Sequence, residues 1–256
     1  MTTQALMKSP PKFRRAASSP AYRRVAEAVE RDILAGRLKA GEPLGTEAAL
    51  VAQFGVNRST VREGIRLLEH SGLVRRDASR RLWVELPRTE RLVSSVRRAL
   101  VLHEVTFREL YDAALALQLA TVEAAVQHAT PAEIDALERN IERTEAKLGD
   151  PAEVAHLDGQ FHELIGGASH NRVLQLAREP SELLVISSTE LVLRKVPEAP
   201  ARLVHAHRMY VDAIRRRDRE AGRLWARRHV EDWRRGFVRA GEDLDRPIDR
   251  IYLESS

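Results

Sequence analysis

The chain has 256 residues, of which 43% are hydrophobic and 31% charged, so the sequence predicts a folded protein with a substantial core. It contains no cysteine, which excludes disulfides, thiolate metal sites and cysteine nucleophiles, and no apolar run approaches the roughly 20 residues of a membrane span. The net charge of +5 is uneven, because residues 1–87 hold 16 Lys and Arg against 9 Asp and Glu, whereas residues 88–256 hold 26 against 28. This asymmetry predicts a polyanion-binding module joined to a module of another kind.

The first nineteen residues form a basic segment of their own. They carry Lys8, Lys12, Arg14 and Arg15 but lack the apolar stretch of a secretory signal. We therefore predict a flexible basic arm over residues 1–19, and a cytoplasmic protein with no membrane partner.

Three helices and a hairpin are predicted over residues 20–87. Apolar residues recur at helical spacing after Pro20, and Gly36 ends this first pattern. Two further helices are expected at 46–54 and from 57 or 58 to about 70, and only a short glycine-containing turn separates them. The runs GLVRR and RLWVEL flank a polar tip and predict a β-hairpin. The turn-rich connection RLKAGEPLG joins the first helix to the second, and this order of elements is a winged helix-turn-helix arrangement.

Everything after Pro87 follows a helical pattern. The motifs TPAE and DPAE each place a capping side chain before a proline and put a glutamate three positions after the cap, so helices are expected to start at Thr130 and Asp150. Further helices are expected at about 88–103, 107–128, 171–193, 198–216 and 219–240. Because no strand signal interrupts these segments, residues 88–256 predict an all-α bundle, and the chain as a whole is mainly α.

The helix expected from residue 58 carries arginine at every fourth position, and these side chains form one outer strip: Arg58, Arg62 and Arg66. Short polar residues occupy its amino-terminal end, where free N–H groups and the helix dipole favour phosphate: Asn57, Ser59 and Thr60. Arginines on the hairpin would add phosphate or minor-groove contacts: Arg75, Arg76, Arg80 and Arg81. An arginine strip alone also fits an ordinary solvated helix face. Together with the tight turn, the hairpin and the basic charge, it predicts a recognition helix for double-stranded DNA.

The stretch DILAGRLKAGEPLGTEAALVAQFGVNRSTVREGIRLLEHSGLV resembles the amino-terminal domain of the GntR family of bacterial transcription regulators. Its core, GVNRSTVREGI, is similar to the family pattern G-V-S-R-x-P-V-R-E-A-L, and Glu47 matches an acidic residue of the family. The resemblance implies that Arg58 and Arg62 contact DNA. The chain departs from the pattern at Asn57 and Thr60, where the family usually has serine and proline.

Two further departures concern DNA contacts. Ala48 stands where many members of the family carry an arginine, and Arg81 lies nearest the wing position where the family often has glycine. The resemblance therefore implies an operator that differs from common family operators, with wing contacts that depend on arginine.

A second constellation lies in the helical part of the chain. Asp158 and His162 are four residues apart on one expected helix face, so both can reach one cation. His207 and His229 follow, separated by about one helix and part of an antiparallel return. Three imidazoles and one carboxylate suit zinc, nickel or another divalent transition ion. A single histidine of this kind is more often structural, and His205 competes with His207 as a ligand.

Residues 95–235 resemble the FCD effector domain of the FadR-type branch of the GntR family. The matched motif positions include Asp158, Phe161, His162, His207 and His229. The resemblance implies that the aspartate and the three histidines bind a divalent metal, with His205 outside the ligand set. It also implies a homodimer that binds a small organic acid, and we assign Asn171, which follows the first motif, to that effector site.

This chain departs from the family where an arginine can meet the effector carboxylate. The family's E-L-R-x-x-L-E stretch corresponds to LYDAALALQ, which places Ala114 and Gln118 at the arginine and glutamate positions. If the effector is an organic acid, its carboxylate must therefore be held by the metal or by another arginine.

We predict a ligand-responsive transcription regulator, and in particular a repressor of a catabolic operon, that binds a palindromic operator. One alternative is a constitutive DNA-binding protein whose metal is purely structural. Another is a metal-dependent hydrolase or lyase, since such a site could activate water. The enzyme hypothesis is the weaker one, because H-E-x-x-H is absent and no carboxylate is evidently placed as a general base.

Overall fold

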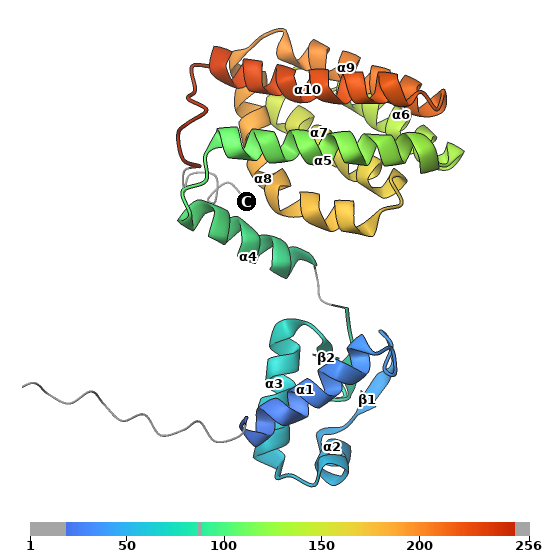
Figure 1. Cartoon of the computed structure of the whole chain (residues 1–256), viewed down its shortest axis with the longest axis vertical. Helices are drawn as coiled ribbons and strands as arrows, with labels where there is room; N and C mark the ends of the chain where they lie inside the picture. The colour runs from blue at the N-terminus through green and yellow to red at the C-terminus, as the bar shows by residue number, and fades with distance from the viewer. Residues whose placement is uncertain (1–18, 87–88, 249–256) are drawn as a thin grey trace, which may run out of the picture. The chain divides into compact units, whose positions relative to one another are not determined.

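The computed structural model describes residues 19–86 and 89–248, and it divides the chain into two compact units between Arg88 and Thr89 (Figure 1). Pro87, at the end of the predicted hairpin region, and the predicted basic arm up to residue 18 lie outside the described residues. None of the described helices is both long and apolar enough to cross a membrane.

The first unit contains three helices and a small antiparallel sheet. The helices are α1 (Ala21–Leu34), α2 (Glu47–Phe54) and α3 (Arg58–Ser71), and the strands are β1 (Pro43–Gly45), β2 (Val74–Arg76) and β3 (Leu82–Val84). The strand order is β1-β3-β2, with Arg75 opposite Trp83 in the hairpin. The winged helix-turn-helix is confirmed, but β1 corrects the sequence interpretation, which expected only a turn-rich connection before α2.

The turn between α2 and α3 forms because the ends of both helices are capped. Gly55 ends α2 in the left-handed conformation, with φ of 62°, and Asn57 starts α3 by accepting a hydrogen bond from the Thr60 N–H. The inner face of α3 buries Val61 and Ile65 completely. A Cβ on Gly64 would lie 2.9 Å from the Tyr22 carbonyl oxygen, so α1 and α3 cross where only glycine fits.

The second unit is an all-α bundle, as predicted. Its helices are α4 (Thr89–Leu102), α5 (Phe107–His128), α6 (Pro131–Glu145), α7 (Pro151–Ala168), α8 (Arg172–Lys195), α9 (Ala199–Arg215) and α10 (Arg219–Arg239). Thr130 and Glu133 form the expected capping box, and Asp150 caps α7. Pro180 lies within α8, as the helix expected over 171–193 implies, although it cannot donate to the carbonyl of the preceding turn. α8 also packs against α4, the first helix of this unit.

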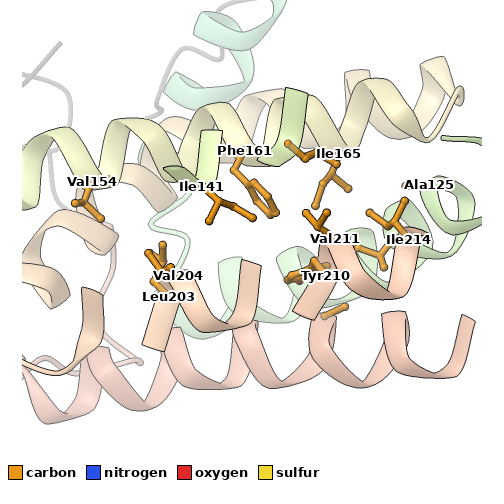
Figure 2. Packing of buried hydrophobic residues seen from close by; sticks show 14 of the residues in the cluster. Ala125, Ile141, Val154, Phe161, Ile165, Leu203, Val204, Tyr210, Val211 and Ile214 are labelled. Atoms are coloured by element: carbon orange, nitrogen blue, oxygen red, sulfur yellow. The ribbon is translucent and has the colours of Figure 1, made fainter. Parts of the chain in front are cut away.

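α7 lies within the core of this bundle, in contact with α5, α6 and α8. Figure 2 shows Phe161 and Ile165 of α7 among side chains from α6 and α9, including Tyr210 and Ile214. Phe161, Ile165, Tyr210 and Ile214 are all fully buried. A helix surrounded in this way normally carries apolar residues on all sides, so the buried Asp158 and His162 on α7 require a specific explanation.

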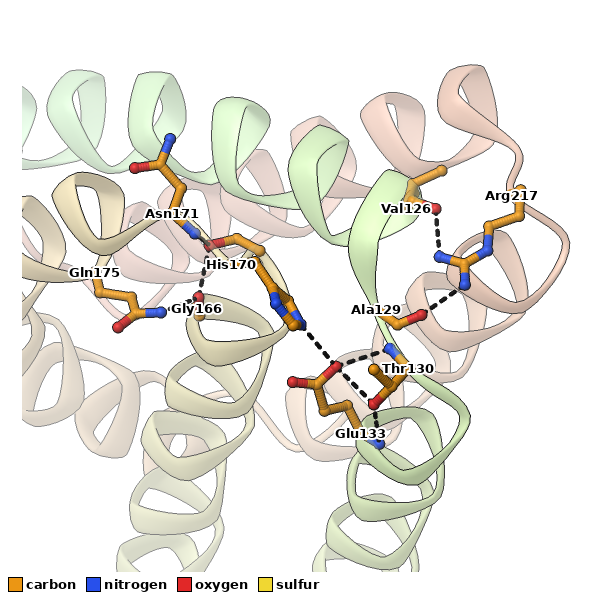
Figure 3. A network of polar contacts seen from close by, with 10 residues as sticks. Val126, Ala129, Thr130, Glu133, Gly166, His170, Asn171, Gln175 and Arg217 are labelled. Carbon is orange, nitrogen blue, oxygen red and sulfur yellow. Dashed lines mark hydrogen bonds and ion pairs between the residues drawn. The ribbon is translucent and has the colours of Figure 1, made fainter.

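Polar contacts secure one end of the bundle (Figure 3). The His170 ring, in the turn between α7 and α8, lies 3.1 Å from the Glu133 carboxylate at the start of α6. Arg217, in the turn between α9 and α10, donates to the carbonyls of Val126 and Ala129 at the end of α5. These contacts connect two inter-helix turns to the ends of neighbouring helices.

Candidate metal centre and nucleic-acid interface

Four side chains predicted as ligands converge inside the bundle. Asp158 and His162 come from α7, His207 from α9 and His229 from α10, and one ligand atom from each lies within 4.8 Å of all the others. His207 is fully buried, Asp158 is 3% exposed and His162 is 9% exposed. Asp158 and His162 lie one turn apart on α7, as their spacing predicted. The packing of α9 and α10 against α7 brings the two remaining imidazoles to the same place.

Three of four distances in this cluster fall within the range expected between ligands of one ion, and the fourth is slightly longer. The Asp158 Oδ1 atom lies 3.1 Å from the His207 Nε2, 3.6 Å from the His162 Nε2 and 3.9 Å from the His229 Nε2. The Nε2 atoms of His162 and His229 are 3.1 Å apart. Atoms bound at about 2.0–2.2 Å to a common ion lie about 3.0–3.6 Å from one another. The four groups therefore surround a space of the size that a transition-metal ion fills.

Hydrogen bonding does not account for these buried polar atoms. The Asp158 Oδ1 and both ring nitrogens of His207 are buried without a hydrogen-bond partner, although the oxygen and the Nε2 are only 3.1 Å apart. The two atoms are thus close but not aligned as donor and acceptor. An unpaired buried carboxylate oxygen is costly, and a cation between the two groups would remove that cost.

Burial also sets the charge of the cluster. It lowers the pKa of His162 well below the usual value, although the Asp158 carboxylate opposes this effect. Burial, followed by the His207 ring, lowers the pKa of His229 to about 4. Burial alone would raise the pKa of Asp158, but the neighbouring imidazoles, His162 foremost, hold it below its ordinary value. At neutral pH the cluster offers neutral imidazoles at His162 and His229 and an ionised carboxylate, the forms that bind a divalent cation.

His205 and His207, the two candidate ligands on α9, lie in different environments. His205 is exposed, and its ring lies edge-on to Trp225, with ring centroids 5.1 Å apart. His207 points inward and stacks on Phe161. The helical register of α9 therefore directs His207, two residues further along, to the cluster and His205 to the surface.

A cavity of about 90 Å³ adjoins the cluster, and Asp158, His162 and His229 form part of its wall. Ala114 and Gln118 also line it, so the α5 positions that the resemblance singled out do face this space. Gln118 donates to the Tyr210 hydroxyl at 3.2 Å and is thereby held against the wall. Neither residue supplies a positive charge to the cavity.

Arg178 of α8 lines the same cavity, and sequence reasoning missed it. Its guanidinium donates to the His162 carbonyl oxygen at 3.1 Å, which fixes it beside the cluster. Residues seven and eight positions further along α8, Val185 and Ile186, face the same cavity. A lone arginine in register with an apolar helical stripe is the pattern that could have identified it.

Asn171, assigned to the effector site from sequence, does not reach this cavity. Its side-chain oxygen accepts hydrogen bonds from the N–H groups of Val173 and Leu174, and the residue is exposed at the start of α8. It acts as a helix cap, because an Asn just before a helix satisfies N–H groups that have no partner within the helix.

In the first unit, the predicted arginine strip lies on the exposed side of α3. Arg58, Arg62 and Arg66 line one cleft, here called the basic cleft, together with residues of α2 and the hairpin: Thr46, Glu47, Ala48, Glu69, Arg76, Ser79 and Arg80. The three α3 side chains are between 50% and 73% exposed. The cleft presents guanidinium groups to a ligand outside the protein, as a DNA-binding face requires.

An acidic residue lies at the centre of this cleft. The Glu47 carboxylate is 3.0 Å from Arg76 and 3.8 Å from the Nε atoms of both Arg58 and Arg62, and its side chain is only 12% exposed. Its placement at the first position of α2 is favoured by the helix dipole. Glu47 therefore holds arginines from α3 and from the hairpin in one arrangement.

The remaining predicted DNA contacts divide into two groups. The Asn57 oxygen accepts hydrogen bonds from the Ser59 hydroxyl and the Thr60 N–H, both at 2.8 Å, so these residues build the amino-terminal end of α3. At the wing, Arg81 is exposed but is not among the residues that line the basic cleft. Arg80 lines the cleft and has φ of 62°, the conformation that glycine adopts easily. At the wing, the conformation that glycine adopts most easily is therefore found at Arg80, one residue before Arg81.

Asp77 organises the turn at the wing tip. Its carboxylate accepts hydrogen bonds from the Trp83 indole N–H, the Ser79 hydroxyl and the Arg81 N–H at 2.7–2.9 Å. These bonds, that of Trp83 foremost, lower the pKa of Asp77 to about 2. The two arginines at the tip are thus presented from an ordered turn.

Comparisons with known proteins match both units. Residues 21–84 match the family described as bacterial regulatory proteins, gntR family, and residues 109–232 match the FCD domain. The chain is 28% identical over 215 residues to the uncharacterized HTH-type transcriptional regulator YdhC of Bacillus subtilis, covering 83% of this chain and 87% of that protein. It is 27% identical to the Glc operon transcriptional activator of Escherichia coli K12, covering 80% of this chain and 84% of that protein.

A repressor is also among the relatives. The HTH-type transcriptional repressor NanR of Salmonella newport is 26% identical, with 76% of each chain covered. The solved structure of Streptococcus agalactiae GntR shares the fold, with a TM-score of 0.59 and 21% identity over 84% of this chain and 99% of that one. The matched families and these relatives are regulators of transcription and not enzymes, which excludes the hydrolase or lyase alternative. This chain belongs to the GntR family of bacterial transcription regulators, in the group that carries a carboxy-terminal FCD domain.

Proposed function

We propose that this regulator binds a palindromic operator as a homodimer and responds to a small organic acid that binds beside a metal ion. The DNA-binding domain would extend over residues 20–87, and the effector and dimerisation domain over 88–256. The observation that carries the proposal is the pair of unsatisfied buried groups, Asp158 and His207, in a cluster that adjoins a cavity, with Asp158 in the cavity wall. A DNA-binding regulator acts beside the chromosome, so the proposed location is the cytoplasm.

The proposed ion is divalent zinc or nickel. Asp158, His162, His207 and His229 would hold it, because three imidazoles and a carboxylate are a ligand set that both ions favour. The bound ion would supply a positive charge at the cavity wall that attracts a carboxylate. The chain itself orients the ligands, excludes bulk water from them and keeps His162 and His229 neutral.

The metal site is tested on the full chain with matched histidine variants. Wild-type protein should bind one zinc ion per chain, measured by elemental analysis after dialysis and by competition with a chelator. His207→Ala should lose this binding, whereas His205→Ala, two residues away on the same helix, should retain it. Retention of zinc by the first variant, or its loss from the second, would contradict the proposed ligand set.

For DNA binding, the proposal assigns Arg58, Arg62 and Arg66 of α3 to the major groove. A dimer that presents two such helices reads two half-sites related by symmetry. Footprinting on the DNA upstream of the gene should show a protected inverted repeat at moderate salt. Arg62→Ala should abolish protection, whereas Arg31→Ala, which removes the same charge from an exposed position of α1, should not.

The proposed homodimer is tested by sedimentation, which should show a dimer. A monomer at micromolar concentration would contradict this part of the proposal.

We further propose that the protein represses a catabolic operon and is released by its effector. The relatives include both a repressor and an activator, so family membership does not decide the sign of regulation. A reporter fused to the protected promoter should increase in activity when the gene is deleted. A decrease would show activation instead. Unchanged operator affinity in the presence of every acid that binds the cavity would favour the constitutive alternative with a structural metal.

A further inference from the structure

Residues 240–248, which follow α10 and are here called the strap, run back to the turn between α4 and α5 (Figure 1). On the way the strap passes the end of α8, where the Lys195 ammonium lies 2.9 Å from the Glu242 carboxylate and donates to the Ala240 carbonyl. The strap thus connects α10 with three other helices of the same unit: α4, α5 and α8.

Backbone hydrogen bonds hold the strap against the α4–α5 turn. The Ile248 N–H donates to the Val105 carbonyl at 2.8 Å, and the Arg108 N–H donates to the Leu244 carbonyl at 2.9 Å. An isolated antiparallel bridge lies between these two bonds. Pairing of this kind fixes the path of the strap beside the turn, because it uses the main chains of both segments.

Side chains secure the same contact. The Arg108 guanidinium donates to both carboxylate oxygens of Asp245, at 2.6 and 2.8 Å, in the two-bond geometry that orients such a pair. Ile248 is 3% exposed and belongs to the buried core of the bundle, against which Leu100 and Val101 of α4 also pack. The strap therefore adds one buried anchor to the core and one ion pair at its surface.

The turn that the strap contacts is strained. At the end of α4 the Glu104 N–H donates to the Val101 carbonyl and the Val105 N–H donates to the Leu100 carbonyl, both at 3.1 Å. These two bonds form a Schellman motif, which requires a left-handed residue, and Glu104 has φ of 52°. Glycine usually fills such a position, because a Cβ makes this conformation unfavourable. A strained residue persists only where its surroundings hold it, and the strap bonds to the next carbonyl.

We propose that the strap keeps the turn after α4 in its strained conformation, and that displacement of the strap frees α4 to move away from α8. α4 begins at Thr89, the first residue after the DNA-binding unit. A conformational signal that passes along the backbone between the two units therefore has to cross α4, and the strap controls how firmly this helix is attached to the bundle. The inference goes beyond the proposed function, because it requires neither the metal nor the acid.

Amide hydrogen exchange of the full chain tests the proposal at the Glu104 and Val105 N–H groups, whose bonds close the turn. Ile248→Ala should speed their exchange by about tenfold or more, because the strap loses its buried anchor. Ile134→Ala removes a buried isoleucine of the same core from α6, so it is the matched control and should leave both rates unchanged. Unchanged exchange in Ile248→Ala, or an equal increase in the two variants, would overturn the proposal.

Glu104→Gly tests the strain and should act in the opposite direction. Exchange of the Val105 N–H should slow about fivefold, since glycine adopts the left-handed conformation without cost. Glycine also makes an unrestrained turn more mobile, so faster exchange in this variant would contradict a turn held under strain. Introduced together with Ile248→Ala, the same substitution should recover part of the lost protection. Absence of any recovery would show that the strap and the turn act independently.

The surface ion pair allows a charge-reversal test. Asp245→Arg places two arginines side by side and should speed exchange at the turn about threefold. Adding Arg108→Asp restores a pair of opposite charges and should recover most of this loss. Arg208→Asp, added instead, alters an exposed pair elsewhere on the bundle and should recover none. Exchange as fast in the double reversal as in Asp245→Arg alone would exclude the ion pair from the strap.

Zinc content and operator binding are measured on the same samples. Both should match the wild type, because none of the substituted residues belongs to the metal cluster or to the basic cleft. Failure of the metal or DNA proposal is therefore seen separately from failure of this one.

Discussion

Phe161 lies flat against His207, with ring centroids 3.7 Å apart and ring planes inclined by only 11°. The two residues come from α7 and α9, and both are fully buried. Because the phenyl ring occupies one face of the imidazole, His207 cannot turn its Nε2 atom away from Asp158 without displacing core side chains. The stack therefore orients a proposed metal ligand through packing.

Replacing Phe161 by leucine should lower zinc affinity about 10- to 100-fold, as loss of an orienting contact to a metal ligand generally does. Chelator competition at neutral pH measures this change. Phe237→Leu is the matched control, since Phe237 is equally buried in the same core but packs on Phe107. Both variants should lose stability, but only the first should lose zinc affinity. Equal zinc affinity in the two variants would show that the stack does not orient His207.

Zinc binding should also stabilise the second unit. An ion present at 100 times its dissociation constant, and bound only by the folded state, raises the free energy of unfolding by about 2.7 kcal/mol. Thermal or urea unfolding with zinc and with a chelator measures this increment. His229→Ala should abolish it, whereas His156→Ala, an exposed histidine on α7, should preserve it. An increment that survives in His229→Ala would place the bound ion elsewhere.

Glu47 is expected to control the specificity of DNA binding more than its strength. In Glu47→Gln, the arginines it holds lose their common anchor while the cleft gains one positive charge. Affinity for unrelated DNA should therefore rise, and the ratio of operator to unrelated-DNA affinity should fall about tenfold, the scale of one lost base contact. Fluorescence anisotropy over a range of salt concentrations measures both affinities. Glu63→Gln, which removes the same charge beside Arg66, is the control and should keep a higher ratio.

The wing should resist acid because the pKa of Asp77 is about 2 in the folded chain and near 3.8 without its partners. A depressed pKa means that the stabilising contribution of this carboxylate is complete above pH 3.8 and is lost as the pH falls through 2. The indole N–H resonance of Trp83, which donates to Asp77, should report this titration in NMR spectra. A midpoint close to 3.8 would show that the three hydrogen bonds do not form in solution.

Most of the fold could be predicted because its elements are marked locally. Thr130 with Glu133, Asp150 and Asn57 are caps whose chemistry is contained within one helical turn, and the structure places a helix after each. β1 could not be predicted in this way, since its three residues form a strand only by pairing with β3. By contrast, the helix expected over 171–193 already included Pro180, and α8 continues through this residue although it cannot donate to the preceding turn.

For the candidate sites too, features contained in one helix were apparent from sequence, whereas features that depend on helix packing were not. The spacing of Asp158 and His162 is a property of one helix and was apparent from sequence, whereas the convergence of His207 and His229 depends on how α9 and α10 pack. Arg178 is one of many arginines in the chain, and only the cavity distinguishes it. Asn171 was assigned to the effector site from sequence, whereas in the structure its side-chain oxygen caps the start of α8.

α8 forms one wall of the cavity and is also the helix on which α4 packs. α4 begins at Thr89, the first residue after the DNA-binding unit. If an acid in the cavity changes operator affinity by a given factor, thermodynamic linkage requires the operator to change the affinity for that acid by the same factor. DNA is then an allosteric ligand of the cavity, and the acid concentration to which the promoter responds is set by the operator-bound form of the protein as well as by the free form.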